Sequence, residues 1–306
     1  MNSKLSRRCA RWLGVVTATV AAVAGLPAAE AAPPAAPGSA LVVLGDSFAA
    51  NGFRWEADAK ECLRGPTSWP TQLSRLMGVA GGSDFVDVSC SGAAIETERG
   101  YSLVQEAINA DKAGAFGPRT KLIAVQFGLN DTWGANPATL WTSLVPCIFN
   151  VAEGCGLEAA AQGRITDYRG VSGAQYAERI RAVVEYLRYY APQAKVVLVG
   201  YPELFPAGQS FTCVSVLGVG QYVQPRGAGL VEYLDRIDAA QRDAATQLGI
   251  EYFDSRALTA GHGLCSAQPW LNGVLDPRAD PVGIPFHPSA HGDSVIAGAL
   301  YERYGK

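Results

Sequence analysis

The chain is poor in several residue types and patterns, and each shortage narrows what it can be. Lysine and arginine number 25 against 28 aspartates and glutamates, so there is no excess of positive charge. This balance gives no electrostatic reason to expect nucleic-acid binding. No CxxC pair occurs, which weakens the case for a cysteine-based metal site. Only three histidines are present, so any site that needs an imidazole must use His262, His287 or His291.

The only long hydrophobic run lies at the N-terminus, within residues 1–31. Four basic residues (Lys4, Arg7, Arg8, Arg11) precede "WLGVVTATVAAVAGL", and a small-residue Ala29-Glu30-Ala31 site follows. This order predicts a secretory signal peptide, exported by the general or the twin-arginine route. An uncleaved anchor is the alternative, but the apolar core falls short of the ~20 residues that span a bilayer.

Cleavage after residue 31 leaves a linker at 32–38 and one domain at 39–306. Residues 1–31 hold four basic and one acidic residue, so the remainder carries 21 basic and 27 acidic residues, a net charge near −6. About 270 residues can bury one large core. We expect a secreted, monomeric protein that inserts into no membrane after cleavage and binds no nucleic acid.

Six cysteines remain outside the predicted signal peptide. An even number in an exported chain predicts three disulfides, for which fifteen pairings are possible. The simplest is sequential pairing, Cys62–Cys90, Cys147–Cys155 and Cys213–Cys265.

Short apolar runs alternate with helical patterns along the chain. The runs lie at 40–45, 84–90, 121–128, 195–202 and 251–254, and most are continuously apolar, as strands covered on both faces require. Helices are expected at 172–192, 230–249 and 291–305, and long loops at 133–172 and 203–228. The pattern predicts a three-layer α/β/α sandwich around a mostly parallel sheet of about five strands.

Polar clusters follow the first three strands, at the edge where ligands bind in such sheets. They are Gly45-Asp46-Ser47, the segment "CSGAAIET" with Gly92, and Gly128-Leu129-Asn130-Asp131. A fourth cluster, "FHPSAHG" with His287, lies near the C-terminus. The tripeptide GDS occurs twice, however, since Gly292-Asp293-Ser294 repeats it. Order and placement, rather than the tripeptide, distinguish Ser47.

In order, these clusters resemble the four blocks of the SGNH (GDSL-type) hydrolases, whose fold is flavodoxin-like. "YPELFP" and "GHGLCSAQPWLN" further resemble the secreted, three-disulfide actinobacterial esterases and lipases. The GxSxG elbow of other hydrolases is absent, as in that family. The resemblance implies a serine esterase or lipase without cofactor or metal. It assigns Ser47 as nucleophile, His287 as base, and Ser47, Gly92 and Asn130 as donors to an oxyanion hole.

Two positions depart from the family. Many members have aspartate three residues before the histidine, where this chain has Ile284. We therefore expect a dyad in which a main-chain carbonyl of Ile284 or Pro285 orients His287, with Ile284 taken first and Asp280 as the rival third member. The second departure is Asp293, which we expect not to affect the chemistry.

The remaining candidates also have structural interpretations. Asp46 and Asp131 are expected to organise their own turns. His262 is interpreted as structural, near the rim of the site, and His291 as an exposed helix residue. Four apolar side chains could line an acyl pocket but fit core packing equally well: Phe48, Ile95, Trp133 and Trp270.

Other functions remain open at this point. The same site could serve a carbohydrate O-acetylesterase or a phospholipase A. A metal-dependent hydrolase would use His287 and His291, four residues apart, and a non-catalytic binding protein is a further alternative.

Overall fold

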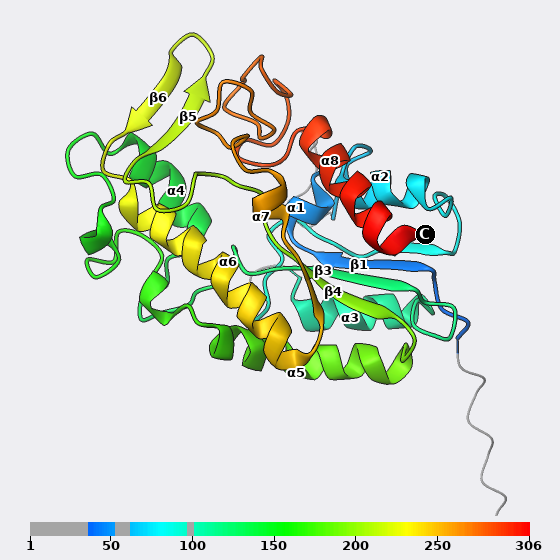
Figure 1. Cartoon of the computed structure of the whole chain (residues 1–306). Coiled ribbons are helices and arrows are strands. Elements are labelled where there is room, and N and C mark those ends of the chain that lie inside the picture. The colour runs from blue at the N-terminus through cyan, green and yellow to red at the C-terminus, as the bar shows by residue number, and fades with distance from the viewer. Residues whose placement is uncertain (1–35, 53–61, 97–100) are drawn as a thin grey trace, which may run out of the picture. The chain divides into compact units, whose positions relative to one another are not determined.

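Five parallel strands form the central sheet of the computed structural model, which describes residues 36–52, 62–96 and 101–306 (Figure 1). The predicted signal peptide lies outside these residues. The strand order is β2-β1-β3-β4-β7, and the predicted parallel sheet with flanking helices is confirmed. The strands are β1 Leu41–Gly45, β2 Phe85–Asp87, β3 Leu122–Gln126, β4 Lys195–Val199 and β7 Glu251–Phe253. This order reverses direction between β1 and β3, a switch point at which such sheets bind ligands.

Alternating side chains of β1 face two separate cores. Val42 and Leu44 belong to the larger core, with helices α3 (Leu103–Lys112), α5 (Gly173–Tyr190) and α6 (Ala228–Leu248). Leu41 and Val43 belong to the smaller one, with helices α2 (Trp69–Leu76) and α8 (Ala290–Leu300). Both faces of the strand are therefore buried, which explains its unbroken apolar run.

Local capping signals fix the ends of the helices. The Ser172 side chain accepts from the N–H of Gln175 at the start of α5, and Ser289 accepts from Gly292 at the start of α8. Helix α6 ends at Gly249, whose left-handed φ of 61° suits glycine. The predicted terminal helix is shorter than expected, because α8 passes into a π-helical turn at Tyr301–Gly305.

The prediction of long loops at 133–172 and 203–228 is wrong, because both segments contain regular structure. Helix α4 (Leu140–Phe149) and two 3-10 turns (Leu157–Ala159 and Tyr168–Gly170) occupy the first segment. Strands β5 (Thr212–Val216) and β6 (Gly220–Gln224) form an antiparallel hairpin in the second. The interior proline of α4 obscured its helical pattern. Two short helices, α1 (Ser47–Ala50) and α7 (Ser255–Leu258), complete the fold.

Three disulfides join the six cysteines sequentially, as Cys62–Cys90, Cys147–Cys155 and Cys213–Cys265. The first holds the chain after α1 against the end of β2. Within the described ranges, no helix is both long and apolar enough to cross a bilayer.

Candidate active site

Ser47 is the first residue of α1, directly after β1. Asp46 caps this helix by accepting a hydrogen bond from the N–H of Phe48 at 2.9 Å. Its second oxygen accepts from the Tyr201 hydroxyl at 2.5 Å. Burial raises the pKa of Asp46 to about 7, although both hydrogen bonds lower it. Asp46 thus organises the turn that presents Ser47.

His287 meets Ser47 from 240 residues further along the chain. Its Nε2 lies 2.7 Å from the Ser47 hydroxyl, and its Nδ1 lies 2.9 Å from the Pro285 carbonyl. We assign the proton to Nδ1, because a carbonyl can only accept. Nε2 is then free to take the serine proton. Burial lowers the pKa of His287 to about 4, so the ring is neutral at pH 7.

The assignment of Ile284 as the orienting carbonyl is wrong. That carbonyl accepts instead from the backbone N–H of His287 and from the side chain of Asn272. Phe286 has a left-handed φ of 68°, so the chain bends back at this residue and presents Pro285 to Nδ1. Asp280 is not the third member either, since its carboxylate accepts from the N–H of Ala290.

Two aromatic rings pack against the imidazole of His287. Phe48 stacks on it with centroids 4.5 Å apart and planes 28° apart. Trp141, from α4, stacks on it at 5.0 Å and 12°. These rings keep water from the imidazole, which is the burial that depresses its pKa.

Gly92 and Asn130 lie in the turns that follow β2 and β3. Gly92 is exposed with a left-handed φ of 81°, and a Cβ built there would meet no atom within 4 Å. The Asn130 amide donates to the Ala93 carbonyl at 2.7 Å. That bond orients the amide and uses one of its two hydrogens, leaving the second available. Asp131 joins the same two turns by accepting from the N–H of Ile95.

Asn51 ties the nucleophile helix to the histidine loop. It ends α1 in the left-handed region (φ 36°). Its amide donates to the Pro288 carbonyl at 2.9 Å and to the Asp293 carboxylate at 2.6 Å. Asp293 is fully buried, and burial raises its pKa well above the usual value. Asp293 therefore helps to hold α1 against the segment that carries His287.

Comparison with known proteins identifies the chain once this geometry is in place. The sequence profile of the GDSL-like lipase/acylhydrolase family matches residues 43–295, most of the chain. The chain belongs to this family. It is therefore a hydrolase of carboxylic esters, and the fold and family predicted from the sequence are confirmed.

Several proteins similar to this GDSL-like hydrolase are Streptomyces lipases. A lipase of Streptomyces rimosus is 27% identical over 95% of this chain and 96% of that protein. Lipase 2 of Streptomyces coelicolor is 29% identical over 92% and 94%. Among solved structures, phospholipase A1 from Streptomyces albidoflavus NA297 superposes with a TM-score of 0.62 at 22% identity, over 87% of this chain and 99% of that one. An extracellular lipase from Streptomyces rimosus gives 0.59 at 22%, over the same shares.

The remaining candidates in this GDSL-like hydrolase are the predicted acyl-pocket side chains and the other two histidines. Ile95 and Trp133 are buried in the core. Trp270 lies between His262, stacked on it at 3.6 Å, and His291, which meets it edge-on. His291 is exposed on α8, while both ring nitrogens of His287 are engaged elsewhere. The structure therefore does not bring the two histidines together as a metal pair.

Sequence reasoning missed Trp141 and Asn51. Trp141 lies in the segment predicted as a loop, so no helical face pointed to it. Asn51 directly follows the last residue of α1, and asparagine is the commonest non-glycine residue in a left-handed cap. That preference was a signal that could have been used.

Proposed function

We propose that Ser47 and His287 hydrolyse acyl esters through an acyl-enzyme. The observation that carries this proposal is the 2.7 Å contact between the serine hydroxyl and a neutral histidine. A serine hydroxyl becomes an effective nucleophile only when a neighbouring base takes its proton. The Nδ1 bond to Pro285 keeps the lone pair of Nε2 directed at Ser47.

In the first half-reaction, the Ser47 oxygen attacks the ester carbonyl while its proton passes to Nε2 of His287. The tetrahedral intermediate carries its negative charge on the former carbonyl oxygen. Three donors support that charge: the N–H groups of Ser47 and Gly92 and the second amide hydrogen of Asn130. Each such donor contributes roughly 3–4 kcal/mol. When the intermediate collapses, the carbon–oxygen bond to the alcohol breaks and the alcohol leaves with the proton from His287.

In the second half-reaction, water attacks the acyl group on Ser47. His287 takes a proton from this water and returns it to the Ser47 oxygen as the acid departs. The free enzyme is restored with its neutral histidine.

The aromatic pair around His287 takes over part of the role of the missing aspartate. When His287 becomes an imidazolium, the faces of Phe48 and Trp141 lie against it at 4.5 and 5.0 Å. Cation–π attraction of this kind contributes about 0.5–2 kcal/mol. The Pro285 carbonyl adds a hydrogen bond, but it carries no full charge.

We propose further that the mature protein works outside the cell, as a monomer, on lipid-like esters. The signal-peptide pattern at 1–31 and three disulfides support export. All proposed catalytic groups come from one chain, so the site needs no second subunit. The apolar, aromatic surroundings of His287 favour lipid-like acyl groups over acetylated polysaccharide.

Labelling with a fluorophosphonate tests the catalytic assignment. The label should appear on the peptide that contains Ser47 and disappear in the His287→Ala variant, because serine then lacks its base. Labelling of another serine, or no labelling at all, contradicts the proposal. Release of fatty acid from a lipid ester, measured against release of acetate from acetylated xylan, separates the two substrate classes.

A further inference from the structure

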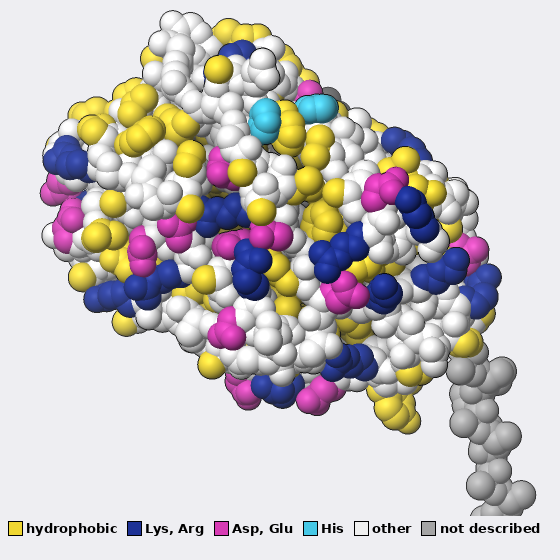
Figure 2. Space-filling view, viewed as in Figure 1, with side chains coloured by type: hydrophobic (Ala, Val, Ile, Leu, Met, Phe, Trp, Pro, Cys, Tyr) yellow, Lys and Arg dark blue, Asp and Glu magenta, His cyan; other side chains and the backbone are white. Residues whose placement is uncertain are grey.

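Two neighbouring segments without charged residues carry exposed apolar side chains near the site. No lysine, arginine, aspartate or glutamate occurs in residues 137–152 or 206–225. The first segment contains α4 and the second contains the β5–β6 hairpin. Figure 2 shows hydrophobic side chains gathered over the base of this hairpin, while charged side chains are more numerous over α5 and α6. We call the four side chains that define this surface the apolar patch: Val145, Phe149, Leu217 and Val219.

The members of the apolar patch are open to solvent. Val145 and Phe149 are 48% and 43% exposed on α4, and Leu217 and Val219 are 60% and 70% exposed in the turn of the hairpin. Apolar side chains scattered singly need no explanation, but several on two neighbouring elements indicate an interaction surface.

A stripe on α4 connects the apolar patch to the catalytic histidine. Trp141, Val145 and Phe149 are four residues apart and therefore share one face of the helix. Trp141 stacks on His287, and Phe149 packs against Tyr222 of the hairpin with centroids 5.2 Å apart. Eight residues of helix span about 12 Å. The stripe thus runs from the base of the proposed dyad to the hairpin in about two helical turns.

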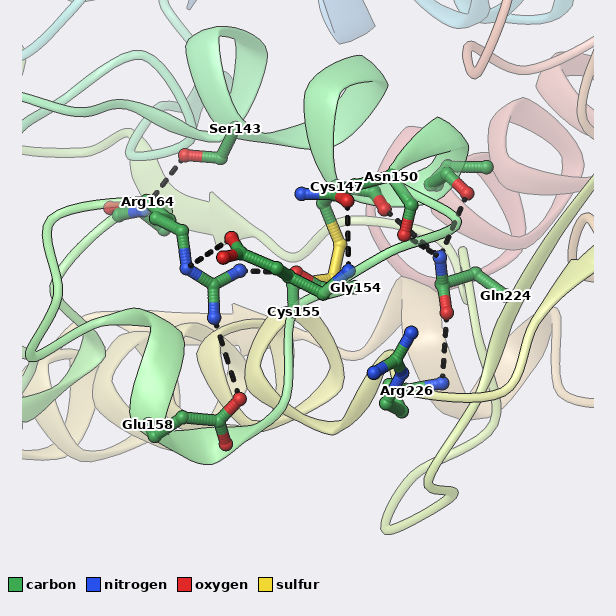
Figure 3. The surroundings of a disulfide bond; sticks show 12 residues. Ser143, Cys147, Asn150, Gly154, Cys155, Glu158, Arg164, Gln224 and Arg226 are labelled. Carbon is green, nitrogen blue, oxygen red and sulfur yellow. Dashed lines mark hydrogen bonds and ion pairs between the residues drawn. A yellow bond between two sulfur atoms is a disulfide. The ribbon is translucent and has the colours of Figure 1, made fainter.

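Hydrogen bonds and a disulfide make α4 and the hairpin one platform (Figure 3). The Gln224 side chain donates to the carbonyls of Cys147, Ile148 and Asn150 at the end of α4. The Cys147–Cys155 disulfide joins that helix end to the following loop. The exposed side chains therefore have a fixed support and do not depend on a flexible loop for their position.

We propose that the apolar patch docks on the surface of a neutral lipid aggregate and delivers ester substrate to Ser47. This inference rests on the proposed lipid-ester function. Continuity with the site argues for a substrate-bearing surface rather than an unrelated partner. The two segments contain no charged residue, and Arg278, which lies beside the hairpin, is paired with Asp276. Together with the negative net charge of the chain, this argues for a neutral rather than an anionic lipid surface.

Binding to phosphatidylcholine vesicles, measured by co-sedimentation, tests the docking surface. In a Leu217→Ser/Val219→Ser variant we expect the partition coefficient to fall by about tenfold or more, because both side chains lose apolar contact with lipid. Binding of the unaltered protein should change little between low and high salt. Hydrolysis of soluble p-nitrophenyl acetate should be unchanged, while hydrolysis of emulsified lipid should fall in parallel with binding.

A matched variant controls for loss of apolar surface in general. Val104→Ser/Ile108→Ser removes two exposed apolar side chains from α3, outside the apolar patch, and should keep vesicle binding. Equal loss in both variants overturns the inference. So does unchanged binding in the hairpin variant, or a dimer of the unaltered protein that the hairpin variant dissociates. The Ser47→Ala variant should bind vesicles normally, so failure of the docking surface is distinguishable from failure of the proposed chemistry.

Discussion

The tripeptide GDS occurs at two places that the fold uses in opposite ways. At Gly45-Asp46-Ser47 it ends a buried strand, and the serine hydroxyl meets a histidine from the far end of the chain. At Gly292-Asp293-Ser294 it lies inside α8, and the Ser294 hydroxyl donates to the His291 carbonyl of its own helix. One serine faces a base, and the other satisfies its hydrogen bond locally.

The two aspartates are more alike than the two serines. Both Asp46 and Asp293 are fully buried, and burial raises the pKa of each. Asp46 holds the nucleophile helix from its start, while Asp293 holds it from its end through Asn51. The second tripeptide therefore supports the first. Position in the fold, rather than local sequence, determines which serine contacts a histidine.

Replacing each serine with alanine should give the largest difference in activity between the two tripeptides. We expect Ser47→Ala to lower kcat on a p-nitrophenyl ester by at least about 10⁴-fold, because no nucleophile remains. Ser294→Ala should stay within about threefold of the original enzyme. Circular dichroism checks that both variants fold, and comparable losses in the two would contradict the distinction.

Asn130 is one of the three proposed oxyanion donors, so Asn130→Ala should give the next largest effect. Loss of one donor should lower kcat by about 10²–10³-fold with little change in KM, because the donor acts in the transition state. Steady-state kinetics on a soluble ester measure this. A rise in KM at constant kcat would instead make Asn130 a substrate-binding residue.

Asn51→Ala should break the link between the two tripeptides. The Pro288 carbonyl and the Asp293 carboxylate would lose a buried donor, at a cost of about 1–3 kcal/mol in unfolding free energy. We expect kcat to fall about tenfold as Ser47 and His287 lose their fixed separation. Asn51→Gly keeps the left-handed cap and should show the same loss. Recovery of kcat in the glycine variant would mean that the backbone, rather than the amide, matters.

The smallest predicted effect is a change in pH dependence. His287 acts as base only when neutral, so kcat/KM should be lost as the pH falls through about 4. Trp141→Ala admits water to the ring and should move this acid limb up by about one pH unit, toward the ordinary value of 6.5. The depressed pKa also stabilises the fold above pH 6.5, and this contribution is lost as the pH falls through about 4. An unmoved acid limb would separate the pKa of His287 from the aromatic enclosure.

Sequence reasoning reached those parts of the molecule that depend on local pattern. Continuous apolar runs such as Leu41–Gly45 predicted buried strands, and the polar residues after them predicted one sheet edge, because parallel strands share the direction of their ends. The regular structure in the two predicted loops was missed. Pro146 and the lack of charge obscured α4, and the hairpin strands are only five residues each.

The details of the site depend on backbone geometry that residue types do not encode. The choice of Pro285 over Ile284 follows from the left-handed bend at Phe286, a conformation that phenylalanine rarely adopts. The enclosure of His287 needs Trp141, which comes from a separate helix. Asp293 differs from the family pattern, so sequence comparison alone suggests that it has no specific role. Its burial and its hydrogen bond to Asn51 are visible only in three dimensions.

The Cys62–Cys90 disulfide links two segments of the candidate site. It joins residues 28 apart in sequence, one after the nucleophile helix and one two residues before Gly92. The N–H of Cys90 also bonds to the Gly45 carbonyl, next to the first tripeptide. In the chain-entropy model, closing a loop of this length lowers the entropy of the unfolded chain. This raises the free energy of unfolding by about 3–4 kcal/mol. Oxidation of these two cysteines therefore links the segment after Ser47 covalently to the segment before Gly92, and this link is retained even when the surrounding packing opens.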